Sequence, residues 1–392
     1  MHWRYGGKWL AMAVLAVGGA TGAGTAAAAA TAVAPVPMTL AGSLQWDQKA
    51  SASGREYRVF VSIPDRPPPP AGYRVLYVLD GNAMFLTAVE AARAMERRPD
   101  VPRDAPAVVV GIGYPPGTDI GAARAFDLTP PGSEHARIRA ATGGADAFLD
   151  FIERDLKPAL AAQVALDPAQ QALFGHSFGG LFVLHALAAR PQAFQTWIAA
   201  SPSVWMIPQG LREAIGSLAG RRDAASPPLR LLVTVGEHEQ RPAPALRAHP
   251  DARKLIALLQ ERTQVDNARA IAALAGGVPG IEVRLDEIAG EDHGTVVPGA
   301  IGRAVWFALA PPLPAPPLPT AQEYLRMTPE QRYDLRLWVR ELPDGRRIPW
   351  LAGLKRTLHD GLTAEQVQAL HAERNRMDQE YGTRPHEVNA PK

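Results

Sequence analysis

Short apolar runs alternate with longer amphipathic segments from Glu56 to about Ala310. Runs such as Val75–Leu79 and Val108–Val110 are apolar at every position, which is typical of strands buried on both faces. The pattern predicts strands at 57–64, 73–80, 107–114, 171–177, 196–201, 229–236 and 281–288. It predicts helices between them at 83–97, 145–163, 180–190, 252–275 and 295–309. Strands that alternate with helices favour an α/β fold with a mostly parallel sheet covered on both faces. The first two strands are a candidate antiparallel hairpin.

The composition changes at residues 311–319, where six of nine residues are proline. Such a segment favours extended polyproline geometry and is typical of a semi-rigid linker. We therefore predict a main domain at 40–310, a linker at 311–319 and a helical C-terminal extension at 320–392. Thr328–Gln331 and Thr363–Gln366 have the pattern of capping boxes at the start of helices. Apolar residues follow the first box at helical spacing: Leu335, Trp338, Val339 and Leu342.

The N-terminus has the pattern of an export signal. Arg4 and Lys8 precede an apolar run at 9–20, and small residues follow as far as Ala34. Glycines interrupt the run before the roughly 20 apolar residues that a membrane helix needs. We predict that residues 1–34 are a signal peptide, that no membrane span remains after processing, and that the protein is periplasmic or secreted. An uncleaved tether is the alternative.

The net charge and the cysteine content exclude several classes of binding partner and of chemistry. Residues 1–34 contain two basic and no acidic residues, so the processed chain has 41 − 2 = 39 Lys and Arg against 39 Asp and Glu. A neutral chain without a basic run gives no electrostatic basis for binding nucleic acid. The sequence contains no cysteine, which excludes disulfides, a thiol nucleophile and thiolate metal sites.

The strongest chemical signal is Gly175-His-Ser-Phe-Gly179, which lies between a predicted strand and a predicted helix. This is the context of a nucleophile elbow, a turn so tight that its flanking positions need glycine. The turn lifts the serine hydroxyl above the sheet, and the following helix brings backbone N–H groups close to it. Ser177 is therefore the candidate nucleophile.

A serine hydroxyl needs a base to take its proton. The histidines within or after the elbow are His176, His185, His238, His249 and His293. Only His293 lies between the last predicted strand and the last helix, where the chain order Ser, acid, His places the base. We expect His176 to point away from Ser177, and the other three to be packed or solvated residues.

The acid of the site is expected after the strand at 229–236. Glu239 lies three residues past Gly236, and Glu237 is the alternative. Asp292 is too close to His293 in sequence to orient it easily. A Ser–His dyad without a strong acid also remains open.

The oxyanion of an acyl-transfer reaction needs two N–H donors. Phe178, directly after the nucleophile, supplies one candidate, and Asn82 in Asp80-Gly-Asn-Ala83 supplies the other. Arg124 on a loop with glycine and proline is a candidate for holding a carboxylate or catecholate. Trp205 could stack on an aromatic acyl group. A solvated Arg124 and a core Trp205 are the alternatives.

Several motifs occur in a characteristic order. They are Tyr77-Val-Leu-Asp-Gly-Asn82, Val109-Val-Gly-Ile-Gly-Tyr114, Phe126-Asp-Leu-Thr-Pro130, Gly144-Ala-Asp-Ala-Phe148, Gly175-His-Ser-Phe-Gly-Gly180, Ser201-Pro-Ser-Val-Trp205 and Gly236-Glu-His-Glu239. Over residues 40–310 the chain thereby resembles the Putative esterase (esterase D-like) superfamily of the α/β-hydrolase fold, and within it the siderophore esterases that open enterobactin-type trilactones.

This resemblance implies ester hydrolysis through an acyl-enzyme, without a metal or other cofactor, with Ser177, Glu239, His293, Asn82 and Phe178 at the functional positions. The implied partner is a small-molecule ester, such as a ferric siderophore. A feruloyl, acetyl or other acyl ester is the alternative substrate. An envelope binding protein with an inactive hydrolase fold is the non-enzyme alternative. The chain departs from the family in its tail from Pro311 and in a variable-looking segment at 240–249.

Overall fold

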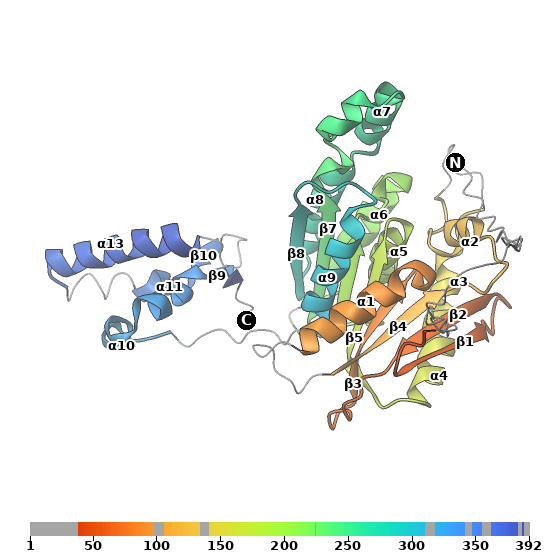
Figure 1. Cartoon of the computed structure of the whole chain (residues 1–392), viewed down its shortest axis with the longest axis horizontal. Coiled ribbons are helices and arrows are strands. Elements are labelled where there is room, and N and C mark those ends of the chain that lie inside the picture. Colours follow the sequence, from red (N-terminus) through yellow and green to blue (C-terminus); the bar gives the residue numbers. More distant parts are fainter. Residues whose placement is uncertain are drawn as a thin grey trace, which may run out of the picture. The chain divides into compact units, whose positions relative to one another are not determined.

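The computed structural model describes residues 38–97, 106–133, 141–223, 225–309, 318–341, 347–354, 362–382 and 386–387. Within these ranges, eight strands form one sheet in the order β1-β2-β4-β3-β5-β6-β7-β8 (Figure 1). The strands are β1 (Ser43–Lys49), β2 (Glu56–Ser62), β3 (Tyr73–Leu79), β4 (Ala107–Gly113), β5 (Leu166–His176), β6 (Thr196–Ala200), β7 (Leu229–Gly236) and β8 (Ile281–Ile288). β3 to β8 run parallel, and β1 and β2 are antiparallel to their neighbours. The predicted mostly parallel α/β fold is confirmed, and it is the α/β-hydrolase fold.

The candidate hairpin at the start of the sheet is wrong. β2 pairs with β1 and with β4, whereas β3 pairs with β4 and β5. Helix α1 (Gly81–Glu96) carries the chain from β3 to β4, and this crossover places β4 between β2 and β3. β4 is buried at every residue, so it needs a strand on each side. β1 was not predicted, because it is an edge strand with only partly covered side chains.

Helices cover both faces of the sheet. α1 and α9 (Val296–Leu309) pack together on one face, and α5 (Phe178–Ala189), α6 (Pro208–Gly216) and α8 (Gln264–Gly276) pack on the other. The predicted helix at 145–163 consists of α3 (Ala145–Asp150), a π-helical turn η1 (Phe151–Leu156) and α4 (Lys157–Ala161). The shorter elements are α2 (Ile120–Asp127), η2 (Val204–Met206), η3 (Ser217–Gly220), η4 (Glu237–Glu239) and η5 (Pro244–Ala248).

The single helix predicted at 252–275 is wrong, because the chain breaks between α7 (Ala252–Arg262) and α8. Thr263 has a left-handed backbone with φ 46°, which ends the helical run. The buried Gln264 side chain donates from Nε2 to the carbonyl of Pro202 at 2.8 Å, which ties the start of α8 to the loop after β6. α7 has no buried residue, so packing does not require it to continue straight into α8.

The C-terminal extension contains helices α10 (Ala321–Arg326), α11 (Pro329–Leu337) and α13 (Ala364–Tyr381), and a turn η6 (Trp350–Gly353). It also contains a small sheet of β10 (Arg347–Pro349), β9 (Trp338–Glu341) and β11 (His386–Glu387). The two predicted capping boxes start α11 and α13.

The helical spacing predicted beyond Leu335 is wrong at Trp338, where the backbone turns extended (ψ 134°) and β9 begins. Leu335, Tyr324, Leu351 and Leu354 form a core cluster within the extension. Leu342, the predicted signal peptide and residues 311–317 of the predicted linker lie outside the described residues. No helix in the described part of the chain is long and apolar enough to span a bilayer.

Candidate active site

Ser177 lies at the sharp turn from β5 into α5, with φ 61° and ψ −115°. A side chain is rarely tolerated in this backbone region, and such strain is common at functional residues. The neighbouring glycines are required by space. A Cβ on Gly175 would lie 2.3 Å from the carbonyl oxygen of Gly179, and one on Gly180 would lie 2.8 Å from that of Ala200. Glycine at 175 and 180 thus permits the tight turn predicted at Gly175–Gly179, whereas the predicted need for glycine at 179 is not seen, because a Cβ there would lie 3.6 Å from its nearest neighbours.

His293 reaches Ser177 from the loop between β8 and α9. Its Nε2 lies 3.0 Å from Ser177 Oγ, and its Nδ1 lies 2.6 Å from Oε2 of Glu239. An ionised carboxylate can only accept, so Nδ1 carries a proton and Nε2 is the acceptor for the serine hydroxyl. The three side chains thus form one hydrogen-bonded chain ordered for proton transfer from Ser177 to His293.

Glu239 is only 2% exposed, so its charge depends on the groups around it. Its Oε1 accepts from the backbone N–H of Gly236 at 2.7 Å and from the hydroxyl of Ser201. Its Oε2 faces His293. With both oxygens occupied, the carboxylate is held in one orientation in the turn η4.

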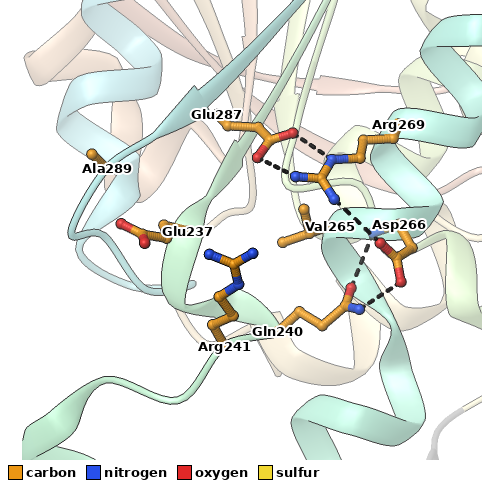
Figure 2. Close-up of a pocket in the computed structure, with 8 residues that line it drawn as sticks. All are labelled: Glu237, Gln240, Arg241, Val265, Asp266, Arg269, Glu287 and Ala289. Atoms are coloured by element: carbon orange, nitrogen blue, oxygen red, sulfur yellow. Dashed lines mark hydrogen bonds and ion pairs between the residues drawn. The ribbon is translucent and has the colours of Figure 1, made fainter.

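Glu237, the alternative acid, points elsewhere. Its Oε2 accepts from the backbone N–H of Gly290 at 3.0 Å. Figure 2 shows its carboxylate at a pocket of about 410 Å³, which also contains the guanidinium groups of Arg241 and Arg269. The residues lining this pocket are Glu237, Gln240, Arg241, Val265, Asp266, Arg269, Glu287 and Ala289, and they include no member of the Ser177–His293–Glu239 chain. Of the two glutamates, Glu239 is the one placed against His293.

His176 packs against the candidate base. Its ring centroid lies 4.7 Å from that of His293, and its side chain is buried. Burial, followed by the charges of His293 and Arg124, lowers the pKa of His176 to about 3, so this ring is neutral at physiological pH. Sequence reasoning assigned it no role. The structure makes it a packing surface for His293.

The other histidines have local partners. His185 Nε2 lies 2.7 Å from Asp146 Oδ1, His238 lies against the carbonyl of Arg241, and His249 accepts from the backbone N–H of Asp251.

The two candidate oxyanion donors lie in the first turns of helices, where backbone N–H groups lack intrahelical acceptors. Phe178 is the first residue of α5, and Asn82 is the second of α1. The Asn82 side chain is already used: its Nδ2 donates to the carbonyl of Tyr114 at 3.0 Å, and its Oδ1 accepts from the Tyr114 N–H at 2.7 Å. The backbone N–H of Asn82 is therefore the group that could serve the site.

The predicted loop position of Arg124 is wrong: the residue lies on helix α2, whose N-cap Asp119 accepts from the N–H of Ala122, and it projects towards the start of α1. It donates from Nε and Nη2 to the two oxygens of buried Asp80, the second bond being 2.9 Å long. Its guanidinium carbon lies 5.8 Å from the centre of the Phe178 ring. Burial lowers the pKa of Arg124 but Asp80 more than compensates, so the net shift is upward and the cation is retained. The predicted binding residue is thus placed beside the oxyanion donors, with Asp80 fixing its orientation.

Trp205 lies in η2 and is half-buried. The guanidinium of Arg262 lies 4.5 Å from the centre of its ring.

Two serines near the site were missed in the sequence. Ser201 holds Glu239, and buried Ser203 has its Oγ 3.2 Å from Ser177 Oγ. Their motif Ser201–Trp205 was noted only for its resemblance.

The described residues contain no cluster of three or more His, Asp or Glu that could hold a metal ion.

The chain is similar to several known proteins. The model of the family described as "Putative esterase" matches residues 50–274. The ferri-bacillibactin esterase BesA of Bacillus subtilis is 39% identical over 270 residues, which cover 66% of this chain and 86% of that protein. The siderophore triacetylfusarinine C esterase of Aspergillus fumigatus is 38% identical over 286 residues, covering 69% and 94% of the two chains. The solved structure of siderophore hydrolase EstB from Aspergillus nidulans superposes with a TM-score of 0.62 at 31% identity, covering 70% of this chain and 98% of that one.

Proposed function

The chain belongs to the Putative esterase family and is an ester hydrolase, and from this premise we propose that it is a serine esterase of catecholate siderophores that works through an acyl-enzyme. The observation that carries the serine mechanism is the hydrogen-bonded chain from Ser177 through His293 to Glu239. It contains a nucleophile, a base and an orienting acid in the order that acyl transfer needs.

In the first half-reaction, Ser177 Oγ attacks the ester carbonyl carbon while His293 Nε2 takes the serine proton. Glu239 stabilises the imidazolium that forms, because its buried carboxylate lies 2.6 Å from Nδ1. The carbonyl electron pair moves to the oxygen, which the N–H groups of Asn82 and Phe178 would hold. His293 then protonates the leaving alcohol, and the acyl group remains on Ser177.

In the second half-reaction, water attacks the acyl carbon and gives its proton to His293 Nε2. The bond from carbon to Ser177 Oγ breaks, and His293 returns the proton to this oxygen. The acid product leaves, and the starting hydrogen-bonded chain is restored.

The names of the relatives support a siderophore substrate, since those cited above act on ferri-bacillibactin and on triacetylfusarinine C. For a catecholate ligand, Arg124 beside Phe178 could donate from the guanidinium N–H groups that it does not use on Asp80. Trp205, two residues after Ser203, offers an aromatic surface that could stack on an aryl group.

The test is a panel of esters under one set of conditions. Iron-free and iron-loaded catecholate trilactones are compared with feruloyl, acetyl and short p-nitrophenyl esters, with Ser177→Ala as the matched blank. The proposal expects the trilactones to have the highest kcat/KM. A higher value for the feruloyl or acetyl esters would keep the serine mechanism and replace the substrate. Labelling of wild type but not of Ser177→Ala by a fluorophosphonate reports on the nucleophile separately from the substrate.

We also propose that residues 1–34 direct export and are then removed. The support is the basic, apolar and small-residue order of this segment. Expression in a bacterial host, followed by fractionation and N-terminal sequencing, tests it. A periplasmic or secreted product starting near Pro35 is expected, and a full-length product retained inside the cell would contradict export.

A further inference from the structure

The hydroxyl of Ser203 lies within hydrogen-bond distance of the candidate nucleophile, Ser177. Its Oγ is 3.2 Å from Ser177 Oγ, and its backbone N–H donates to the carbonyl of Ser177 at 3.1 Å. The residue is 1% exposed. Two hydrogen bonds thus join the turn after β6 to the elbow.

The direction of the hydroxyl–hydroxyl bond follows from counting protons. Nδ1 of His293 donates to the Glu239 carboxylate, so Nε2 must accept, and the Ser177 proton is directed to it. Ser177 Oγ then has only lone pairs to offer Ser203. Ser203 is therefore the donor, and Ser177 Oγ is the acceptor.

We propose that Ser203 is a further catalytic residue that assists deacylation by donating its hydroxyl hydrogen bond to Ser177 Oγ as that oxygen leaves. This inference rests on the proposed acyl-enzyme mechanism. It assigns a role to a hydroxyl that touches the reacting atom and that the triad does not include.

The hydrogen bond from Ser203 should accelerate deacylation more than acylation, because Ser177 Oγ starts the two half-reactions in different chemical states. Acylation starts from a free hydroxyl whose oxygen already accepts the bond from Ser203, so little is gained on the way to the transition state. Deacylation starts from an acyl ester, whose alkoxy oxygen shares its lone pair with the carbonyl and is a poor acceptor. Only an interaction that is stronger in the transition state than in the starting state accelerates a step.

In the deacylation step, each bond that forms is matched by a bond that breaks. The water oxygen bonds to the acyl carbon, the water proton goes to His293 Nε2, and the carbonyl electron pair goes to the oxyanion. When the tetrahedral species collapses, the oxyanion pair re-forms the carbonyl, the pair of the breaking bond goes to Ser177 Oγ, and this oxygen takes the proton from His293. Ser203 keeps its own proton throughout and supplies only the hydrogen bond.

Ser201 is a matched control in the same turn. It is also a buried serine, but its hydroxyl donates to Glu239 Oε1 and so acts through the acid on His293. His293 transfers protons in both half-reactions. Ser201 is therefore a positioning residue, and its loss should slow both of them.

The experiment is a single turnover of p-nitrophenyl acetate with enzyme in excess, on wild type, Ser203→Ala and Ser201→Ala. Release of p-nitrophenol gives the acylation rate. Acid quenching and mass spectrometry of the acetyl adduct on Ser177 give the deacylation rate. For Ser203→Ala, deacylation should slow about tenfold, as expected for one hydrogen bond to an oxygen that is gaining charge, and acylation should change less than about twofold. For Ser201→Ala, both rates should fall together.

Ser203→Gly removes the same hydroxyl with different packing and should reproduce the selective loss. If Ser203 only packs the elbow, both rates of its variants fall in proportion. That result, or an unchanged deacylation rate, would overturn the inference. If wild type forms no acetyl adduct at all, the acyl-enzyme mechanism itself fails, which is a different result from an adduct whose decay ignores Ser203.

Discussion

Glu239→Gln is the change that tests the assignment of the acid most directly. Oε1 of Glu239 accepts from the N–H of Gly236 and from the hydroxyl of Ser201, so this side of the side chain needs an acceptor. In the variant the amide oxygen would occupy it, and the amide NH₂ would face His293 Nδ1. Nδ1 must then accept, which places the imidazole proton on Nε2, where it blocks transfer from Ser177.

The loss has two sources. One is the wrong tautomer, and the other is the missing charge beside the imidazolium. At an effective dielectric constant of about 20, opposite charges about 4 Å apart attract by about 4 kcal/mol, which is about 10³-fold in rate. Loss of the tautomer preference adds to this, so we expect a total of about 10⁴-fold in kcat, the size of the loss when a triad carboxylate is replaced.

Glu237→Gln is the matched control, two residues away in the same turn. Its carboxylate accepts one hydrogen bond, from Gly290 N–H, and an amide oxygen can accept the same bond. We expect kcat within about twofold of wild type, as for a surface change that keeps its contact. Both variants are assayed for kcat and kcat/KM on p-nitrophenyl acetate, with circular dichroism to check folding. A larger loss for Glu237→Gln would move the acid to that residue, and small losses in both would favour a Ser–His dyad.

Four further predictions follow from the same geometry. Ser177→Ala should abolish detectable turnover with the thermal unfolding profile retained, and a variant with wild-type kcat would refute the mechanism. His293→Ala should abolish turnover of p-nitrophenyl acetate, because the serine then has no base to take its proton, whereas His185→Ala should keep it. The pKa of His176 is about 3 in the folded state and 6.5 in the unfolded state, so between these pH values the folded state binds fewer protons. The contribution of His176 to stability is therefore present above about pH 6.5 and falls as the pH drops. The urea midpoints at pH 7 and pH 5 should differ less in His176→Gln than in wild type. A chain that ends at Ala310 should keep a similar kcat on p-nitrophenyl acetate, since each residue of the proposed mechanism precedes it; a folded but inactive truncation would mean that the extension completes the site.

The elbow could be predicted from sequence because its cause is local. A turn that brings the backbone of residue 179 within contact of residue 175 excludes a Cβ at residue 175, and the glycine there records this requirement, whereas a Cβ at residue 179 would lie 3.6 Å from its nearest neighbours. The parallel strands were predictable for a similar reason. A strand such as β4, buried at every residue, must be apolar at every residue.

Chain order predicted which loops would meet, but it could not choose between side chains within a loop. Glu237 and Glu239 are the same residue type in the same turn. Their difference arises from the fold, which places Gly290 against one and His293 against the other. The break at Thr263 has the same origin, since the anchor of Gln264 on Pro202 joins segments 62 residues apart and leaves no trace in helical periodicity.

The roles of the two serines in the Ser201–Pro202–Ser203 turn could not be predicted from the sequence. Serine is common in loops, and neither hydroxyl would be noticed by its charge or its spacing. Both are buried here, and the large majority of buried hydroxyls have a hydrogen-bond partner. Each of the two partners belongs to the proposed mechanism, Glu239 for Ser201 and Ser177 for Ser203. A polar residue in a loop acquires a catalytic assignment only when the fold shows that it is buried and which atom it contacts. The different effects expected for Ser201→Ala and Ser203→Ala follow from those contacts, because one hydroxyl acts on the acid and the other on the nucleophile.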